Sequence, residues 1–167
     1  MPAGTIATAI LDTPIGPLSV LAHQEALVGA GFTADPGELH ARLHRSLRPL
    51  PLVAAELPWL AKPLRDYFDG DLTALHTLPV HQPAAGARER VWAQLRAVRP
   101  GTTITYTGLA ARAGIPQAPR AAGAACAANL VAPVVPCHRA LRSDGSLGGY
   151  YYGLARKRWL LHHEGAA

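Results

Sequence analysis

Hydrophobic and polar positions in the first part of the chain alternate in the manner of β-strands. Three short stretches rich in apolar and β-branched residues show this alternation, at residues 5–11, 17–23 and 26–32, and a period of two is typical of half-buried strands. Thr13-Pro14-Ile15-Gly16 and His23-Gln24-Glu25 separate them and have turn composition. The pattern predicts a small antiparallel sheet at the N-terminus.

From residue 36 the apolar positions recur three and four residues apart, which is the period of an amphipathic helix. We predict helices over residues 36–45 and 57–68, separated by a connector rich in Pro and Leu at residues 48–52. Asp69-Gly70-Asp71 should end the second helix.

Residues 72–86 show little periodicity and contain Pro79 and Pro83, so we expect a linker there. It would separate an N-terminal domain, residues 1–80, from a C-terminal domain, residues 84–167. The C-terminal part shows helical periodicity at residues 88–98, 106–113, 118–128 and 153–163. The fold class is therefore predicted as α/β of the α+β type, with a small antiparallel sheet and helices first and a mostly helical domain after it.

The helices at 106–113 and 118–128 are joined by Gly114-Ile115-Pro116-Gln117, a connection typical of a helix-turn-helix. The second helix carries mostly Ala and Gly, and Arg120 is its only long polar side chain. Reading base edges requires longer polar side chains, so we expect close, sequence-independent contact with DNA, from the minor groove. The alternative is that the small residues allow close helix packing inside the protein.

Charge is distributed unevenly along the chain. Residues 1–83 hold five Lys/Arg against eight Asp/Glu, a net charge of −3, whereas residues 84–167 hold eleven against three, a net charge of +8. The basic half favours a polyanionic partner. The alternative is a solvated face of an arginine-rich protein.

Cysteine content and hydropathy suggest a cytoplasmic protein. Cys126 and Cys137 are the only cysteines, and the first residues lack the charged and apolar segments of a secretory signal. No apolar run approaches the roughly 20 residues that span a bilayer. We expect a reducing compartment and no membrane role.

Cys137 lies in the stretch Pro136-Cys137-His138-Arg139. A cysteine acts as a nucleophile in its thiolate form, which a neighbouring base favours. Adjacent side chains on a strand point to opposite faces, so His138 would act on Cys137 through a bridging water, and Glu164 is a candidate for orienting the imidazole. The alternative is that Cys and His are neighbours by coincidence.

The eight histidines are scattered and neither cysteine has a partner at zinc-ligand spacing, so we predict no metal site and no cofactor.

The residues around Cys137 resemble the active-site signature of the O6-alkylguanine-DNA alkyltransferases. The C-terminal half shares Pro136-Cys137-His138-Arg139, the run 143–150, Gly153-Leu154, Lys157, Trp159-Leu160-Leu161 and Glu164-Gly165. The resemblance extends upstream through Val91-Trp92, Gly101-Thr102-Thr103, Tyr106, Leu109-Ala110, Arg120-Ala121, Gly123 and Asn129, and more loosely to residues 13–18. The resemblance is strong over about the last 80 residues and weak over the first 80.

The resemblance implies direct repair of DNA, by irreversible transfer of the O6-alkyl group of guanine, or the O4-alkyl group of thymine, to Cys137 after base flipping. His138 would act through a water as the base and Glu164 would hold it. Asn129 would brace the turn that presents the cysteine, and Tyr106 would donate a proton to the leaving guanine.

The resemblance also implies the binding residues. Arg120, Ala121 and Ala127 would contact double-stranded DNA in its minor groove with little sequence specificity, and Arg120 would fill the gap in the base stack. The pocket residues would be Tyr150, Tyr151, Ala140 and Ala132, with main-chain groups of Cys137, Ala140 and Tyr151 bonding the guanine. The protein would act as a monomer, with a ribonuclease H-like first domain in support.

Tyr151 and Tyr152 stand where the family usually has small residues. Two added phenols would narrow the pocket and favour methyl over benzyl groups. Two other functions stay open at this point: a DNA-binding module or regulator that uses the same helix-turn-helix without chemistry, and a cysteine hydrolase.

Overall fold

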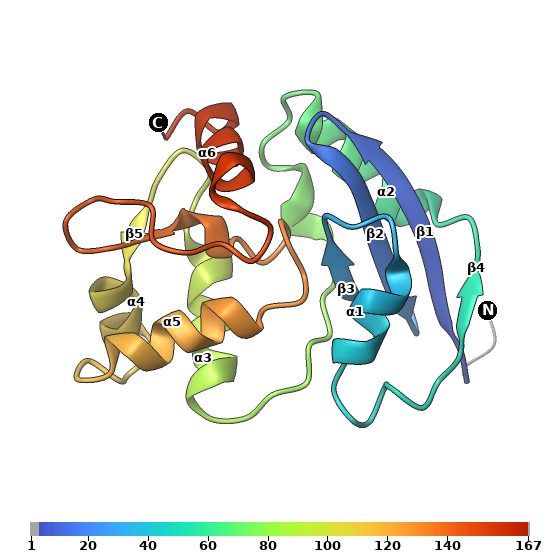
Figure 1. The fold of residues 1–167 in the computed structure, drawn as a ribbon, viewed down its shortest axis with the longest axis horizontal. Helices are drawn as coiled ribbons and strands as arrows, with labels where there is room; N and C mark the ends of the chain where they lie inside the picture. Colours follow the sequence, from blue (N-terminus) through green and yellow to red (C-terminus); the bar gives the residue numbers. More distant parts are fainter. Residues whose placement is uncertain (1–3, 167) are drawn as a thin grey trace. The chain divides into compact units, whose positions relative to one another are not determined.

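The computed structural model describes residues 4–166 and divides the chain into two compact units. The first unit contains residues 4–82 and the short segment 130–134, and the second contains residues 83–129 and 135–166. The first holds the larger sheet, and the second holds most of the helices (Figure 1). The α+β class predicted from the sequence is confirmed.

The sheet of the first unit has four strands in the order β3-β2-β1-β4. Three of them, β1 (Ile6–Thr13), β2 (Gly16–His23) and β3 (Ala26–Gly31), form the predicted antiparallel meander. Gln24 and Glu25 both have positive φ, 49° and 63°, the conformation that a two-residue hairpin turn requires.

The fourth strand, β4 (Leu52–Ala54), pairs in parallel with β1, so the sheet is mixed rather than purely antiparallel. This strand was not predicted because it has only three residues and directly follows Pro49 and Pro51 in the predicted connector. Its pairing depends on the chain returning to the edge of β1, which no local pattern reports.

Two helices pack with the sheet, and a short 3-10 helix packs against the second of them. They are α1 (Pro36–Arg42), α2 (Pro58–Phe68) and η1 (Ala74–Thr77). The side chain of Asp35 caps α1 by accepting a hydrogen bond from the Gly37 amide at 2.9 Å. Leu60, Leu64 and Tyr67 of α2 are buried at helical spacing, as predicted for residues 57–68.

The segment 130–134 belongs to the first unit although it lies in the sequence between the two parts of the second. The Ala30 amide donates to the carbonyl of Leu130 at 2.7 Å, and the Ala132 amide donates to the carbonyl of Ala30 at 3.0 Å. These bonds satisfy the outer edge of β3, which would otherwise expose its main-chain groups. The sequence did not predict this return of the chain.

The second unit is built mainly from helices. Its elements are α3 (Ala87–Ala97), β5 (Ile104–Thr105), α4 (Tyr106–Arg112), α5 (Pro119–Ala128), η2 (Cys137–Arg139), β6 (Ala140–Leu141) and α6 (Leu154–His163). Helices α3, α4 and α5 pack on one another, and the Trp92 indole donates to the Ala125 carbonyl at 2.8 Å. Thr105 caps α4 through the Gly108 amide at 3.0 Å. The two-residue strands β5 and β6 pair in parallel.

Within residues 4–166, none of the helices combines the length and the apolar character that a membrane crossing needs.

Candidate active site

Cys137 begins the short helix η2 and is 8% exposed. The Asn129 amide nitrogen donates to Cys137 Sγ at 3.3 Å and to the Val135 carbonyl at 2.8 Å. Asn129 ends α5, so it ties this helix to the turn that carries the cysteine. Burial raises the pKa of Cys137, while the Asn129 hydrogen bond and the positive charge of Lys157 act in the opposite direction.

His138, Arg139 and Glu164 form a buried network next to Cys137. His138 Nε2 and Glu164 Oε2 are 2.9 Å apart, and Arg139 makes two parallel hydrogen bonds to the same carboxylate, at 2.9 and 2.8 Å. Arg139 Nη1 also donates to the Val98 carbonyl at 2.6 Å. A bidentate arginine fixes both the charge and the orientation of a carboxylate, so Arg139 positions Glu164. Sequence reasoning had assigned no role to Arg139.

In this network the Glu164 carboxylate is held in its charged form and the His138 imidazole in its neutral form. Burial alone would raise the pKa of Glu164, but the hydrogen bonds from Arg139 and His138 outweigh it and hold that pKa well below its ordinary range. Burial lowers the pKa of His138, against the effect of Glu164. A neutral imidazole that donates from Nε2 to an ionised Glu164 leaves Nδ1 as its basic nitrogen. Nδ1 has no hydrogen-bond partner within residues 4–166.

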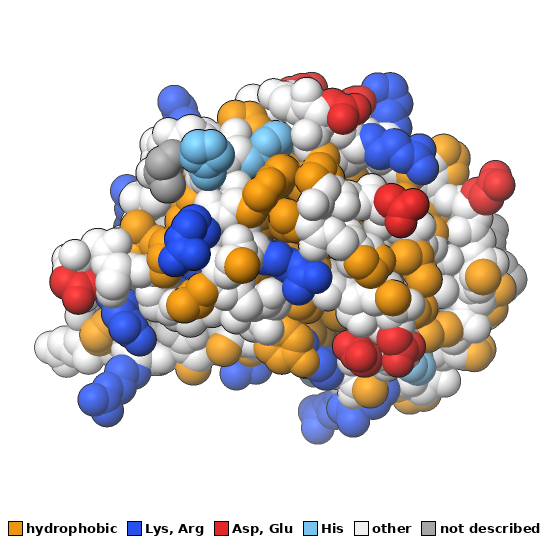
Figure 2. Space-filling view, turned by 45° about the horizontal axis from the view of Figure 1, so that its top comes forward, with side chains coloured by type: hydrophobic (Ala, Val, Ile, Leu, Met, Phe, Trp, Pro, Cys, Tyr) orange, Lys and Arg blue, Asp and Glu red, His pale blue; other side chains and the backbone are white. Residues whose placement is uncertain are grey.

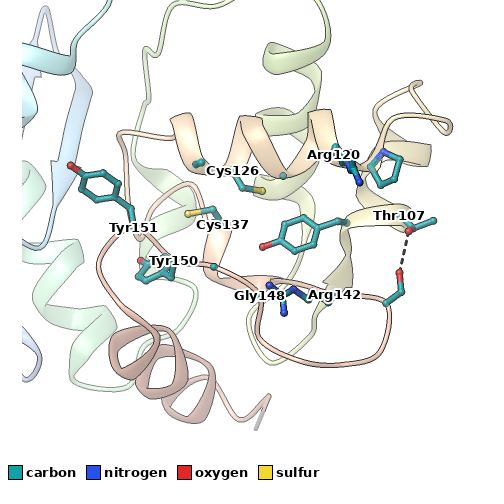
Figure 3. Close-up of a pocket in the computed structure, with 14 residues that line it drawn as sticks. Thr107, Arg120, Cys126, Cys137, Arg142, Gly148, Tyr150 and Tyr151 are labelled. Atoms are coloured by element: carbon teal, nitrogen blue, oxygen red, sulfur yellow. Dashed lines mark hydrogen bonds between the residues drawn. The ribbon is translucent and has the colours of Figure 1, made fainter.

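Cys137 lies in a pocket of about 590 Å³ that is formed entirely within the second unit (Figure 3). The residues around it are Tyr106, Thr107, Pro119, Arg120, Gly123, Cys126, Ala127, Cys137, Arg142, Ser143, Gly148, Gly149, Tyr150 and Tyr151. Besides η2, which carries Cys137, three segments contribute: α5, the start of α4, and the loop between β6 and α6.

The Tyr106 ring is flanked by two glycines. A Cβ on Gly123 of α5 would lie 4.0 Å from the ring, and a Cβ on Gly148 would lie 3.1 Å from both the ring and the hydroxyl. Burial and the neighbouring Cys126 and Cys137 raise the pKa of Tyr106 to about 12. The phenol therefore stays protonated at neutral pH and is available as a proton donor.

Lys157 anchors the loop that forms one wall of the pocket. It is fully buried on α6, and its Nζ donates to the carbonyls of Ala140 at 2.7 Å, Gly149 at 3.1 Å, and Leu147. No carboxylate among residues 4–166 forms an ion pair with it. Sequence reasoning missed this role, although Lys157 and Glu164 share the spacing of the buried Leu160 and Leu161, and ionisable residues on an apolar helix face are a usable signal.

Helix α5 presents two faces of different kinds. Ala122, Ala125 and Cys126 are buried, whereas Arg120, Ala121, Ala124 and Ala127 are exposed. One face therefore packs inside the protein, as in the alternative weighed from the sequence, and the other face is exposed. At the left of Figure 2, over the second unit, most of the visible charged side chains are Lys or Arg.

Two of the four residues predicted to form the pocket line it in the structure, and two do not. Tyr150 and Tyr151 border the pocket, but Tyr151 is 61% exposed and its phenol points away from Cys137 in Figure 3. Ala132 and Ala140 are not among the lining residues. The Ala140 carbonyl is bound by Lys157, and Ala132 lies in the first unit.

Tyr152 is likewise absent from the pocket lining. It packs edge-on against Tyr150 and Tyr151, with ring centroids 5.8 and 4.9 Å apart. Of the two added phenols, Tyr152 therefore does not narrow the pocket, whereas Tyr151 borders it with its phenol directed away from Cys137. Cys126 also lines the pocket with Cys137, and burial raises its pKa to about 12.

Comparison with known proteins identifies the family. Residues 86–166 match the family described as 6-O-methylguanine DNA methyltransferase, DNA binding domain. The chain is 39% identical over 159 residues to the methylated-DNA--protein-cysteine methyltransferase of Salmonella typhimurium, with 93% of each chain covered. It is 38% identical over 168 residues to the Homo sapiens protein of the same name, over 93% of this chain and 78% of the human one.

The fold agrees with these relatives. The crystal structure of Mycobacterium tuberculosis OGT in complex with DNA matches with a TM-score of 0.82 and 30% identity, over 96% of this chain and 93% of that chain. The resemblance seen in the sequence is confirmed: this chain belongs to the family of methylated-DNA--protein-cysteine methyltransferases.

Proposed function

We propose that this protein repairs alkylated DNA directly, by moving the O6-alkyl group of guanine, or the O4-alkyl group of thymine, irreversibly to Cys137. The observation that carries the proposal is the position of Cys137, which lines a pocket and is followed directly by the buried His138-Glu164-Arg139 network. A module that only binds DNA has no use for a thiol with this support.

In the proposed reaction, His138 Nδ1 takes the proton of the Cys137 thiol through a bridging water, and Glu164 stabilises the imidazolium that results. The thiolate attacks the alkyl carbon, so that a carbon–sulfur bond forms as the carbon–oxygen bond breaks. Tyr106 gives its proton to the guanine as it leaves, and the proton on His138 returns to the phenolate through solvent. The products are guanine and an S-alkylcysteine.

The thioether has no leaving group that would regenerate the thiol, so each protein molecule reacts once. Asn129 supports this chemistry by holding the turn at Cys137 and by donating to its sulfur at 3.3 Å. A reduced cysteine is required throughout, which favours the cytoplasm as the site of action.

Binding of DNA is proposed to use α4 and α5 as a helix-turn-helix, with the exposed face of α5 in the minor groove. Ala121 and Ala127 would allow close approach of the backbone, and Arg120 would occupy the space of the extruded base. This face has few groups that read base edges, so little sequence preference is expected. The protein would act as a monomer, and residues 1–80 would form a ribonuclease H-like supporting domain.

The test is the mass of the intact protein after exposure to duplex DNA that contains O6-methylguanine. We expect a permanent gain of one methyl group, located on Cys137 by peptide mapping, and no gain with unmodified DNA. A DNA-binding regulator without chemistry would bind both duplexes and gain no mass. A cysteine hydrolase would show turnover without lasting modification.

A further inference from the structure

Arg142 is a second arginine at the pocket, on a different segment from Arg120. Arg120 projects from α5 and Arg142 from the loop after β6, and Figure 3 shows the two side chains on separate parts of the pocket wall. None of the fourteen lining residues is an aspartate or glutamate. The mouth of the pocket is therefore positive on two sides.

The main chain of Arg142 is held in a closed turn. Its amide donates to the Ser146 carbonyl at 3.0 Å, and its carbonyl accepts from the Gly145 amide at 2.9 Å. The hydroxyls of Ser143 and Thr107 are 3.2 Å apart, which connects this turn to the start of α4. The first part of the Arg142 side chain lies against Gly148, where an added Cβ would be 3.5 Å from Cγ. The base of this side chain is thus fixed before any ligand binds.

The Arg142 guanidinium, in contrast, is available to a ligand. The residue is exposed, and within residues 4–166 its guanidinium has no ion pair and no hydrogen bond. Among the described residues, the nearby Asp144 forms no ion pair with it, and Oδ1 of that carboxylate accepts from the amide and the hydroxyl of Ser146 at 2.9 and 2.6 Å. Arg139, three residues earlier, differs in this respect, since its guanidinium is buried and hydrogen-bonded to Glu164 and to the Val98 carbonyl.

From this placement we propose that Arg142 binds a backbone phosphate next to the flipped nucleotide. The inference rests on the proposed function, because it supposes that a nucleotide enters this pocket. A base that reaches Cys137 leaves its sugar at the pocket mouth and brings its two flanking phosphates to the rim. The arginine fork matches a phosphate with two hydrogen bonds and carries no base preference. Arg142 is thus a positioning residue that holds the extruded strand.

The first test compares Arg142→Ala with wild type on two substrates, methylated duplex DNA and the free O6-methylguanine base. We expect about a tenfold slower second-order transfer from duplex DNA and an unchanged rate with the free base, which has no phosphate. The slope of log affinity for the duplex against log salt should decrease by about 0.9, the value for one phosphate contact. Arg142→Lys should retain most of the salt slope because it retains the charge.

Arg45→Ala is the matched control, because it removes one exposed arginine from the first unit. It should leave both rates and the salt slope unchanged. An Arg142→Ala variant that behaves like this control would overturn the proposal. Equal losses on duplex and free base would also overturn it, since Arg142 would then act on the chemistry of the nearby Tyr106 phenol.

The second test places a neutral methylphosphonate at one or other of the two phosphates that flank the lesion. If Arg142 binds one of these phosphates, the transfer rate of wild type on that duplex should fall by the same factor as Arg142→Ala loses on the unmodified backbone. The rate of Arg142→Ala should then fall no further on the methylphosphonate duplex. Additive losses at both positions would refute the contact. A wild-type protein that gains no methyl group from any substrate would instead refute the proposed function, so the two failures are distinguishable.

Discussion

Removal of the Arg139 guanidinium should destabilise the protein strongly. Arg139→Ala takes away two hydrogen bonds to Glu164, at 2.9 and 2.8 Å, and one to the Val98 carbonyl at 2.6 Å. The Glu164 side chain has no exposed surface, so it would remain as a buried charge that has lost both hydrogen bonds from Arg139. Breaking a buried pair from one side costs about 3 to 5 kcal/mol.

A loss of that size is a large fraction of the total stability of about 5 to 15 kcal/mol that a folded chain has. For a chain of this length it corresponds to a fall in Tm of about 6 to 20 °C. Thermal unfolding followed by circular dichroism measures it, with Arg158→Ala as the control because Arg158 is exposed on α6. The double variant Arg139→Met with Glu164→Gln should recover part of the loss. If Arg139→Ala melts within 2 °C of the control, on the order of 1 kcal/mol or less, the reasoning is refuted.

The same carboxylate predicts a dependence of stability on pH. The pKa of Glu164 is depressed in the folded protein from an ordinary value of 4.5. Its contribution to stability is therefore fully present above pH 4.5 and is lost as the pH falls toward the folded-state pKa. Urea denaturation between pH 7 and pH 3 should show this loss in wild type and a smaller one in Glu164→Gln. Identical profiles would contradict it.

Four further predictions concern the pocket. Cys137→Ser should gain no methyl group, whereas Cys126→Ser should still gain one, and a methyl group mapped to position 126 in wild type would reverse the assignment. Arg120→Ala should slow repair of duplex DNA far more than reaction with free O6-methylguanine, because only the duplex requires flipping; equal losses would exclude a stack-filling role. Lys157→Met should lower the free energy of unfolding by at least about 2 kcal/mol, since it leaves buried carbonyls without a donor, and denaturation midpoints test this. Gly148→Ala should slow transfer by about tenfold, because the position has φ +70° and a Cβ would lie 3.1 Å from Tyr106; an unchanged rate would show that Tyr106 can move freely.

Local pattern was a sufficient guide for the helices and for the first three strands. The spacing of Leu60, Leu64 and Tyr67 indicates which face of α2 is buried, and such periodicity depends only on nearby residues. The same holds for the candidate nucleophile. Cys137 with His138 is contiguous in sequence, and Glu164 was found because acids are scarce in the basic half.

The missed features all depend on partners far apart in the chain. Arg139 bonds Glu164 across 25 residues and Val98 across 41, and no pattern near Arg139 announces either partner. The return of residues 130–134 to the edge of β3 is of the same kind. So is β4, whose three residues gain their structure from β1.

Side-chain direction is the other property that the sequence did not provide. Tyr151 and Tyr152 were expected to fill the pocket, yet their rings pack on one another and the Tyr151 phenol points away from Cys137. Lys157 looked like one basic residue among several on α6, but packing buries it against three carbonyls. By itself the sequence determined the helices, the basic half and the candidate nucleophile, because periodicity, charge and neighbouring residues are local. Only the tertiary structure decided which polar groups become buried and paired, because burial depends on segments that meet only after folding.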